Sequence, residues 1–202
     1  MVYNPFMISC ILLAAGESRR FQSPKALAVF NGLPLIEFTL KKLFTTTLEE
    51  IIVVLGSNSE LIKPHILKDN RLKCALNTNY QLGQTSSFKT GLKTTNPKTH
   101  GFLLLPIDMP LITPETIDTL IDCFLKQAPL ILVPTFQDKK GHPPLFSMDL
   151  RDEMLHLDDK QPLSDILRQH EAEILKYPIK DEGVVLSFNT PAEFENILQK
   201  AR

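Results

Sequence analysis

Short apolar runs and segments with helical spacing follow one another along most of the chain. Runs of aliphatic and β-branched residues predict buried strands at residues 7–15, 51–55, 72–76, 101–105, 130–134, 174–179 and 184–188. Between these runs, apolar residues recur at every third or fourth position, which predicts helices. The helical segments are residues 35–44, about 60–67, 88–92, 113–125, 150–157, 163–167 and 190–198.

Capping residues support several of these helices. Pro34 suits a first turn, and Thr113 followed by Pro114 suits a cap and a first helical position. Two segments have the spacing of a capping box, residues 57–60 and residues 190–193. Strands that alternate with helices predict a mostly parallel sheet with helices on both faces. In such sheets ligands bind outside the carboxyl ends of the strands, so we expect the site there.

Length and composition favour an ordinary enzyme-sized domain. The 202 residues, 43% of them hydrophobic and 22% charged, predict a single domain over residues 1–202. A formal net charge of −1 argues against a nucleic-acid or anionic-membrane binder. Residues 1–6 lack a basic leader segment, and the following apolar run is too short to span a bilayer, so we expect a cytoplasmic protein.

The cysteines form no recognisable framework. Cys10, Cys74 and Cys123 lie far apart and are odd in number, which argues against a disulfide scaffold or a zinc site. All three sit in apolar surroundings, so we expect buried, reduced thiols.

The first predicted strand ends at a glycine, Gly16, and a basic loop follows it. The loop contains Ser18, Arg19, Arg20 and Lys25. Glycine lets a ligand approach the backbone, free N–H groups of a turn can face an anion, and the cations supply further donors. Neither the Walker pattern G-x-x-x-x-G-K-[ST] nor the dinucleotide pattern G-x-G-x-x-G is present. The order strand, glycine, arginine, lysine therefore predicts an anion site of another type.

The motif L-A-A-G-x-S-x-R followed by P-K-x-L resembles the signature of nucleotidyltransferases with the nucleotide-diphospho-sugar transferase fold. Gly16, Ser18, Arg20, Lys25 and Leu27 match that pattern. Phe21 and Gln22 stand where this family usually has Met-Gly, so we expect the turn after Arg20 to differ.

Further motifs along the chain narrow the resemblance. The polar segment at residues 77–88 contains N-x-x-Y-x-x-G-x-x-S-S, which resembles the segment that closes over the nucleotide in molybdenum-cofactor-type nucleotidyltransferases. Its alternative interpretation is an ordinary polar loop with a helix cap. Asp108 follows a predicted strand and lies between two prolines, which suits a Mg²⁺ ligand, although a turn or cap residue is the alternative. D-M-P-L-x-x-P also resembles this family's metal-binding motif, with Ile107 in place of a common glycine.

A last motif, G-H-P at residues 141–143, resembles the subfamily that acts on molybdopterin. A lone histidine is more often structural than catalytic, and a phosphate monoester is already a competent nucleophile. We therefore interpret Gly141, His142 and Pro143 as acceptor-binding residues, as the resemblance implies.

Taken in this order, the motifs are similar to those of molybdenum cofactor cytidylyltransferases. The resemblance implies a three-layer α/β/α Rossmann-like sandwich with a mixed, mostly parallel sheet, and transfer of CMP from CTP to the terminal phosphate of molybdopterin with release of pyrophosphate. It implies Arg20, Lys25 and Asp108 as catalytic residues, Mg²⁺ as cofactor, and a molybdoenzyme or its chaperone as a partner. The implied nucleotide site consists of Leu13, Ala14, Ala15, Gly16, Ser18, Arg20, Lys25, Asn79, Gly83, Ser86 and Ser87.

One departure from the family concerns the metal. The family's C-terminal motif usually reads D-x-D-T-P, and its second aspartate helps to hold the ion. Here the stretch is Ser187-Phe188-Asn189-Thr190-Pro191, so Asn189 can offer only a neutral amide oxygen. A sugar phosphate or phosphocholine as acceptor, and a non-catalytic nucleotide-binding accessory protein, remain alternative hypotheses.

Overall fold

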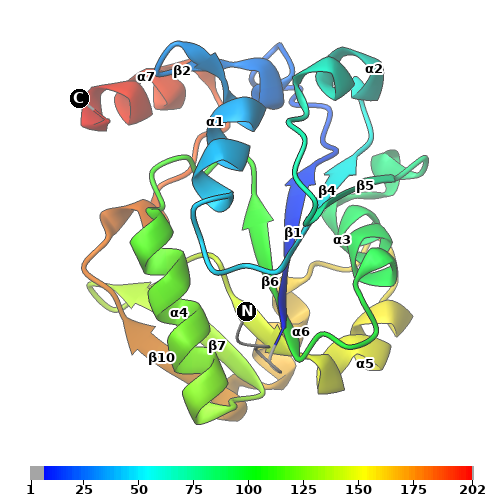
Figure 1. The fold of residues 1–202 in the computed structure, drawn as a ribbon, viewed down its shortest axis with the longest axis vertical. Helices are drawn as coiled ribbons and strands as arrows, with labels where there is room; N and C mark the ends of the chain where they lie inside the picture. The colour runs from blue at the N-terminus through cyan, green and yellow to red at the C-terminus, as the bar shows by residue number, and fades with distance from the viewer. Residues whose placement is uncertain (1–6, 202) are drawn as a thin grey trace.

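The computed structural model describes residues 7–201, and one mixed sheet runs through it (Figure 1). The strands are β1 (Ile8–Ala14), β4 (Glu50–Leu55), β5 (Leu72–Leu76), β6 (Gly101–Pro106), β7 (Ile131–Phe136), β8 (Lys139–Lys140), β9 (Leu145–Ser147) and β10 (Ile174–Pro178). Their order is β10-β7-β9-β6-β1-β4-β5, and β8 pairs with Thr135 and Phe136 at the end of β7. A short separate hairpin joins β2 (Val29–Phe30) to β3 (Leu33–Pro34).

Most neighbours in the sheet are parallel, as the alternation of strands and helices predicts. Strand β1 pairs in parallel with β4 and β6, β4 with β5, and β7 with β10. Strand β9 runs antiparallel between β6 and β7, which makes the sheet mixed. In register, Leu13 lies beside Val54 on one side and Pro106 on the other, so β1, β4 and β6 end at the same rim. The predicted fold class is confirmed.

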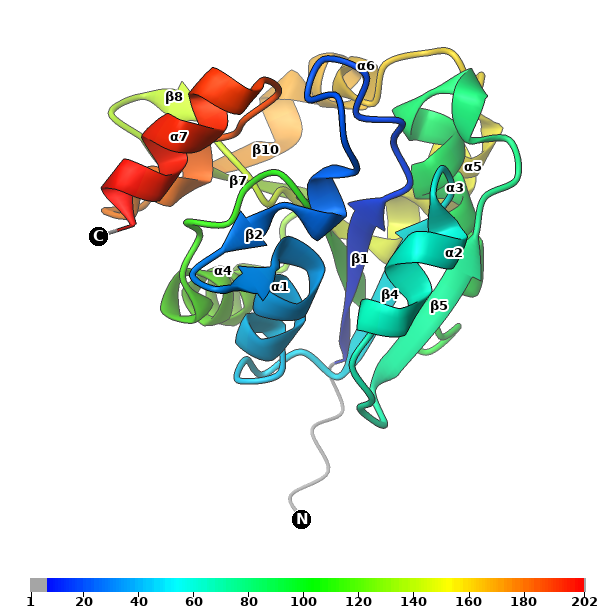
Figure 2. The same cartoon turned by 90° about the horizontal axis from the view of Figure 1, so that it is seen from above.

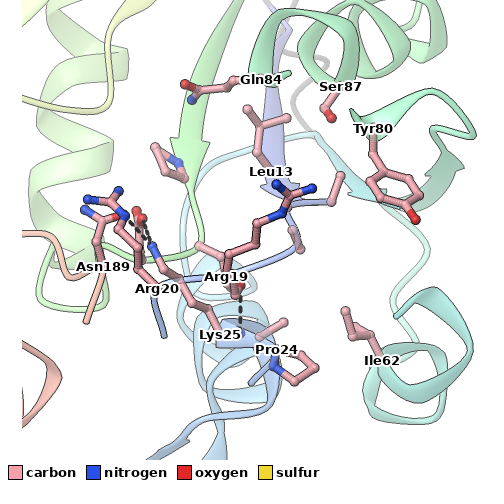
Figure 3. Close-up of a pocket in the computed structure, with 18 of the residues that line it drawn as sticks. Leu13, Arg19, Arg20, Pro24, Lys25, Ile62, Tyr80, Gln84, Ser87 and Asn189 are labelled. Atoms are coloured by element: carbon pink, nitrogen blue, oxygen red, sulfur yellow. Dashed lines mark hydrogen bonds and ion pairs between the residues drawn. The ribbon is translucent and has the colours of Figure 1, made fainter. Parts of the chain in front are cut away.

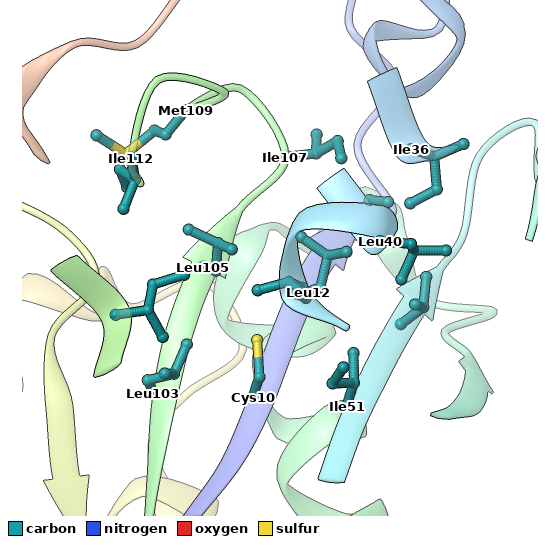
Figure 4. Close-up of a cluster of buried hydrophobic side chains, with 14 of the residues drawn as sticks. Cys10, Leu12, Ile36, Leu40, Ile51, Leu103, Leu105, Ile107, Met109 and Ile112 are labelled. Atoms are coloured by element: carbon teal, nitrogen blue, oxygen red, sulfur yellow. The ribbon is translucent and has the colours of Figure 1, made fainter. Parts of the chain in front are cut away.

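Alternation along each strand sends side chains into two separate apolar clusters, one on each face of the sheet. Cys10 and Leu12 of β1 face α1 (Leu35–Leu43) and α4 (Pro114–Gln127), as Figure 4 shows for α1. Their neighbours Ile11 and Leu13 face the opposite side, toward α3 (Gln84–Thr94) and α5 (Arg151–His156) (Figure 2). Because both faces are covered, the central strands β1, β4 and β6 are almost wholly apolar rather than alternating with polar residues.

Two of the predicted helix starts have the expected capping hydrogen bonds. The side chain of Thr113 accepts a hydrogen bond from the backbone N–H of Thr116 at the start of α4. Thr190 and Glu193 form a full capping box at the start of α7 (Pro191–Lys200), with proline in the first turn in both helices.

Two local predictions are wrong. The proposed capping box at residues 57–60 does not form, because Asn58 adopts a left-handed conformation and no side chain caps α2 (Ser59–Ile62). That helix ends at Ile62 and is followed by a 3-10 turn over Lys63–His65, where Pro64 restricts the residue before it. Residues 184–188 form no strand: the 3-10 turn Glu182–Val185 occupies their start, and residues 186–188 continue as a loop in which Phe188 is buried.

The remaining helix α6 (Ser164–Gln169) packs beside α5 on the second face. Cys10 is buried as predicted, and burial raises the pKa of its thiol, but Cys74 on the edge strand β5 is exposed and Cys123 only partly buried. All three are free thiols. Among residues 7–201, no helix has the length and apolar character needed to cross a membrane. The prediction for the segment at residues 1–6 concerns residues outside the described range.

Candidate active site

A cavity of about 370 Å³ lies at the rim where β1 and β6 end (Figure 3). Both the basic loop after β1 and the segment after β6 contribute to its wall. It is lined by Leu13, Ala14, Ala15, Gly16, Ser18, Arg19, Arg20, Pro24, Lys25, Ala26, Ile62, Tyr80, Gly83, Gln84, Ser87, Pro106, Ile107, Asp108 and Asn189. The structure therefore brings most of the predicted site residues together from segments far apart in the sequence.

The basic loop is a tight turn organised by Ser18. Its carbonyl accepts hydrogen bonds from the N–H groups of Phe21 (2.9 Å) and Gln22 (3.0 Å), and its hydroxyl accepts one from the N–H of Lys25 (3.2 Å). Gln22 has φ +64°, a conformation that glycine adopts without strain. The expected difference from the family's turn stays a prediction. Phe21 packs on Phe188 with ring centroids 5.2 Å apart.

Gly16 faces open space. A Cβ built at this position meets no atom within 4 Å, so packing inside the protein does not require a glycine here. The residue lines the cavity, where the missing side chain leaves room for a ligand next to the backbone.

Three side chains converge at the charged end of the cavity. The ammonium of Lys25 lies 2.6 Å from Oδ2 of Asp108 and 3.0 Å from Oδ1 of Asn189, to which it donates hydrogen bonds. It also lies 5.2 Å from the centroid of the Phe188 ring, close enough for a cation–π contact. Figure 3 shows Arg20 beside Asn189 at this end.

Backbone contacts fix the two oxygen donors. The N–H of Ile107 donates to the carbonyl of Leu13 (3.1 Å), and the N–H of Phe188 donates to the carbonyl of Asp108 (3.3 Å). The carboxylate of Glu193 accepts from the N–H of Asn189 at 2.5 Å. This hydrogen bond, together with one from the N–H of Thr190 (3.0 Å), holds the pKa of Glu193 below its usual value. The C-terminal segment is thereby joined to the segment that carries Asp108.

The other end of the cavity has a different character. Figure 3 shows Ile62 and Tyr80 on the side away from Lys25, with Ser87 above them. An apolar side chain, an aromatic ring and neutral hydrogen-bonding groups suit a nucleobase better than a phosphate.

Asn77 supports this end from behind. Its amide donates to the hydroxyls of Ser86 and Ser87 at 3.0 Å each, and its Oδ1 accepts from the N–H of Asn79 (2.9 Å). Sequence reasoning missed Asn77, Tyr80, Gln84 and Ile62 as site residues. Asn77 directly follows the strand β5, so the strand-end rule could have found it; no sequence signal identifies Ile62.

Several predicted residues lie outside the cavity wall. Asn79 is exposed and contacts Asn77 and Ser86 through its backbone. Ser86 is buried and bonds to Asn77 and to the carbonyl of Asn79. Their roles in nucleotide binding stay predictions, and the geometry favours an indirect contribution.

The G-H-P segment packs next to the site rather than into its wall. The N–H of His142 donates to the carbonyl of Val184 (2.8 Å), and a Cβ on Gly141 would lie 2.5 Å from the same oxygen. Close packing therefore requires a glycine at 141, whatever the acceptor is. Burial lowers the pKa of His142 and so favours its neutral form, an effect that the nearby charge of Asp108 partly offsets.

The donor set at the charged end fits a hard divalent cation that brings further ligands with it. Asp108 and Asn189 offer a carboxylate and an amide oxygen that meet at one point, now held by Lys25. Among residues 7–201, no three His, Cys, Asp or Glu side chains gather to hold a metal by themselves. Mg²⁺ commonly takes one or two protein oxygens and completes its shell with phosphate oxygens and water.

Sequence comparison identifies relatives over most of the chain. The sequence model described as a MobA-like NTP transferase domain matches residues 10–174. The bifunctional protein GlmU of Enterococcus faecalis is 32% identical over 114 residues, which is 55% of this chain but only 24% of GlmU. A probable molybdenum cofactor guanylyltransferase of Thermococcus gammatolerans is 29% identical over 132 residues, 63% of this chain and 62% of that protein. The chain thus spans about a quarter of the GlmU protein that it matches.

Solved structures show the same fold over nearly the whole chain. Rv0371c from Mycobacterium tuberculosis superposes with a TM-score of 0.85 at 21% identity, covering 97% of this chain and 100% of that one. A structure of Rv0371C in complex with manganese superposes with a TM-score of 0.80 at 22% identity, covering 96% and 98%.

Proposed function

Because the chain belongs to the family of MobA-like NTP transferases, as its motifs predicted, we propose that it transfers CMP from CTP to the terminal phosphate of molybdopterin. The observation that carries the proposal is the two-ended cavity. Lys25 and Asp108 stand at one end, and Tyr80 and Ser87 at the other, in a space of about 370 Å³. That arrangement suits a ligand with a base at one end and phosphates at the other.

The proposed reaction exchanges one phosphate bond for another. A phosphate oxygen of the acceptor forms a bond to the α-phosphorus of CTP, and the bond from that phosphorus to the oxygen bridging to the β-phosphate breaks. Pyrophosphate leaves with the electron pair. Charge accumulates on the leaving group and on nonbridging oxygens, so catalysis consists mainly of positioning and electrostatic stabilisation. A divalent cation, when bound by Asp108 and Asn189, supplies charge neutralisation for phosphate oxygens.

Arg20 and Lys25 supply the protein's own cations in this proposal. Arg20, exposed at the rim, donates to the β- and γ-phosphates, and Lys25 neutralises charge near the α-phosphate. In the structure Lys25 is bonded to Asp108 and Asn189. Nucleotide binding therefore requires an exchange, in which Lys25 gives up these oxygens and donates to phosphate.

The choice of CTP rests on Ala15, because the guanylyl branch of the family more often has glycine at this position. Ala15 lines the cavity, and its carbonyl accepts a hydrogen bond from the N–H of Ser57 (3.0 Å). We expect CTP with Mg²⁺ to raise the melting temperature more than GTP does, since binding to the native state alone raises stability with ln(1 + [L]/Kd). An equal or larger shift with GTP would overturn the base assignment and leave the fold unaffected.

Release of pyrophosphate across a set of acceptors tests the reaction itself. CTP and Mg²⁺ are supplied with molybdopterin, a sugar phosphate or phosphocholine, and no acceptor serves as the blank. Release with molybdopterin alone supports the proposal; release with another acceptor reassigns the substrate. Nucleotide binding without release for any acceptor favours the accessory-protein hypothesis, in which the chain delivers cofactor to a molybdoenzyme or its chaperone.

A further inference from the structure

The segment that carries Asp108 is held at three points beyond β6. The carbonyl of Asp108 accepts a hydrogen bond from the N–H of Phe188 (3.3 Å), and the N–H of Thr113 donates to the carboxylate of Asp181 (2.9 Å). Between these points, the ammonium of Lys42 donates to the carbonyl of Pro110 at 2.7 Å. We propose that Lys42 is a positioning residue, which sets the place of the Asp108 carboxylate by holding this carbonyl. The inference rests on the nucleotidyl transfer proposed above.

Lys42 combines a desolvated ammonium with the lack of an ion-pair partner among residues 7–201. Asp181 is the acid whose charge acts on it, yet the oxygens of Asp181 accept hydrogen bonds from Thr113, Thr116 and Gly183. Burial lowers the pKa of Lys42 to about 8, and Asp181 offsets part of this effect. A desolvated ammonium is unfavourable in a protein unless it makes a specific contact, and here that contact is the carbonyl of Pro110.

The carbonyl of Pro110 depends on Lys42 in turn. Pro110 is buried, and Lys42 is the hydrogen-bond donor to its carbonyl within the described part of the chain. A buried carbonyl that loses its donor has to move toward water or another donor. Pro110 is two residues from Asp108, so this movement passes directly into the carboxylate's position.

Buried side chains restrict the backbone between Pro110 and Asp108. Figure 4 shows Ile107, Met109 and Ile112 along the segment, and all three are buried. Proline fixes φ at position 110, which leaves fewer torsions to absorb a shift. A displacement at Pro110 therefore moves Asp108 rather than being taken up between them.

The helix α1 provides a fixed base for Lys42. Ile36, Leu40 and Leu43 of α1 are fully buried against the sheet, and Lys42 lies in the last turn. The aromatic ring of Phe38, one turn earlier, lies 5.7 Å from the ammonium and restricts where the side chain can point. The core thus positions Lys42, and Lys42 positions the segment with Asp108.

The test compares Lys42→Met with Lys41→Met. Lys41 is the exposed neighbour on the same helix turn, so its substitution removes an equal charge without touching Pro110. Dissociation constants for CTP are measured by calorimetry with Mn²⁺ and with EDTA, and their ratio gives the gain in affinity due to the metal. We expect Lys42→Met to reduce this ratio about tenfold or more and to leave the affinity in EDTA within about threefold. Lys41→Met should match the wild type in both conditions.

Turnover gives a second reading. Pyrophosphate release by Lys42→Met should show kcat lowered by about 10- to 100-fold, with a smaller change in KM for CTP. Lys42→Arg keeps a cationic donor on a long side chain, and it should recover part of the metal-dependent ratio. That recovery would not follow if Lys42 only filled space.

An unchanged metal-dependent ratio in Lys42→Met, or an equal loss in Lys41→Met, overturns the positioning role. The binding measurement needs no acceptor and no turnover. If the wild type binds CTP with Mn²⁺ but releases no pyrophosphate, the proposed transfer fails while the test of Lys42 stands.

Discussion

Replacing Lys25 by methionine should strongly reduce turnover and, at the same time, increase the affinity of the nucleotide-free protein for a divalent metal. The methionine keeps the length of the side chain and removes its charge. In the structure the ammonium occupies the meeting point of Asp108 and Asn189, at 2.6 Å and 3.0 Å. A metal ion that binds these oxygens has to displace it.

The magnitude follows from this geometry. Unit charges at 2.6 Å attract by roughly 6 kcal/mol at an effective dielectric constant of 20, before solvation is taken into account. The side chains of Lys25 and Asp108 are 11% and 20% exposed, so water screens the pair incompletely. A hydrogen bond between charged groups contributes about 1.5–3 kcal/mol net. Removing that competition should lower the Kd for Mn²⁺ by roughly tenfold to a hundredfold.

The assay is the electron paramagnetic resonance signal of free Mn²⁺, which falls as the ion binds to protein. Lys25→Met should bind Mn²⁺ more tightly than the wild type, and Lys25→Met with Asp108→Asn should lose the gain. Lys63→Met, which removes an exposed lysine paired with Glu60, controls for net charge. Pyrophosphate release by Lys25→Met should fall by about 10²–10³-fold, the usual loss for one preorganised electrostatic contact.

Two results would refute this reasoning. If Lys25→Met binds free Mn²⁺ no better than the wild type, the lysine does not occupy the metal position. If its turnover is close to normal, Lys25 has no part in stabilising phosphate charge. Either result leaves the fold and the family assignment intact.

The remaining predictions concern the metal, the turn, the packing of α3 and the pH dependence of stability. Asn189→Asp should lower the Mg²⁺ concentration for half-maximal turnover, because a carboxylate adds charge to the site; an unchanged value would remove residue 189 from the metal site. Gln22→Gly should raise the melting temperature by about 1–3 °C, because it relieves a left-handed glutamine at φ +64°. The larger conformational entropy of glycine in the unfolded chain offsets part of this stabilisation, and thermal unfolding without ligand measures the net effect. Gly91→Ala should destabilise the protein by about 1–3 kcal/mol in urea unfolding, because a Cβ there would lie 2.5 Å from the side chain of Ile11. The pKa of Lys42 is about 8 in the folded protein and about 10.4 in the unfolded chain. Between these pH values the unfolded state binds more protons than the folded state. The stability of the wild type relative to Lys42→Met should therefore increase as pH rises from about 8 to about 10.5. The gain is at most about 3 kcal/mol, and a difference that is flat across this range would contradict it.

The pattern of apolar residues was enough to predict the parallel strands, the helical layers and the rim where the site lies. Runs such as residues 51–55 are rich in β-branched residues, and burial on both faces of the sheet leaves a continuous apolar pattern that the sequence itself displays. The caps at Thr113 and Thr190 are local too, because each hydrogen bond joins residues three positions apart. The loop after Gly16 was recognisable for the same reason: its residues are neighbours in the chain.

Contacts between segments far apart in the sequence could be seen only in the tertiary structure. Residues 184–188 have the composition of a strand, but they form a 3-10 turn and a loop that brings Phe188 and Asn189 into contact with the ammonium of Lys25. The apolar residues around Cys74 in the sequence predicted a buried thiol. Cys74 is exposed because β5 is the edge strand of the sheet. No sequence motif identifies Lys42 as a functional residue. Its contact with Pro110 spans 68 residues and exists only because the core fixes α1 beside the segment that follows β6, a relation set by packing rather than by any local preference.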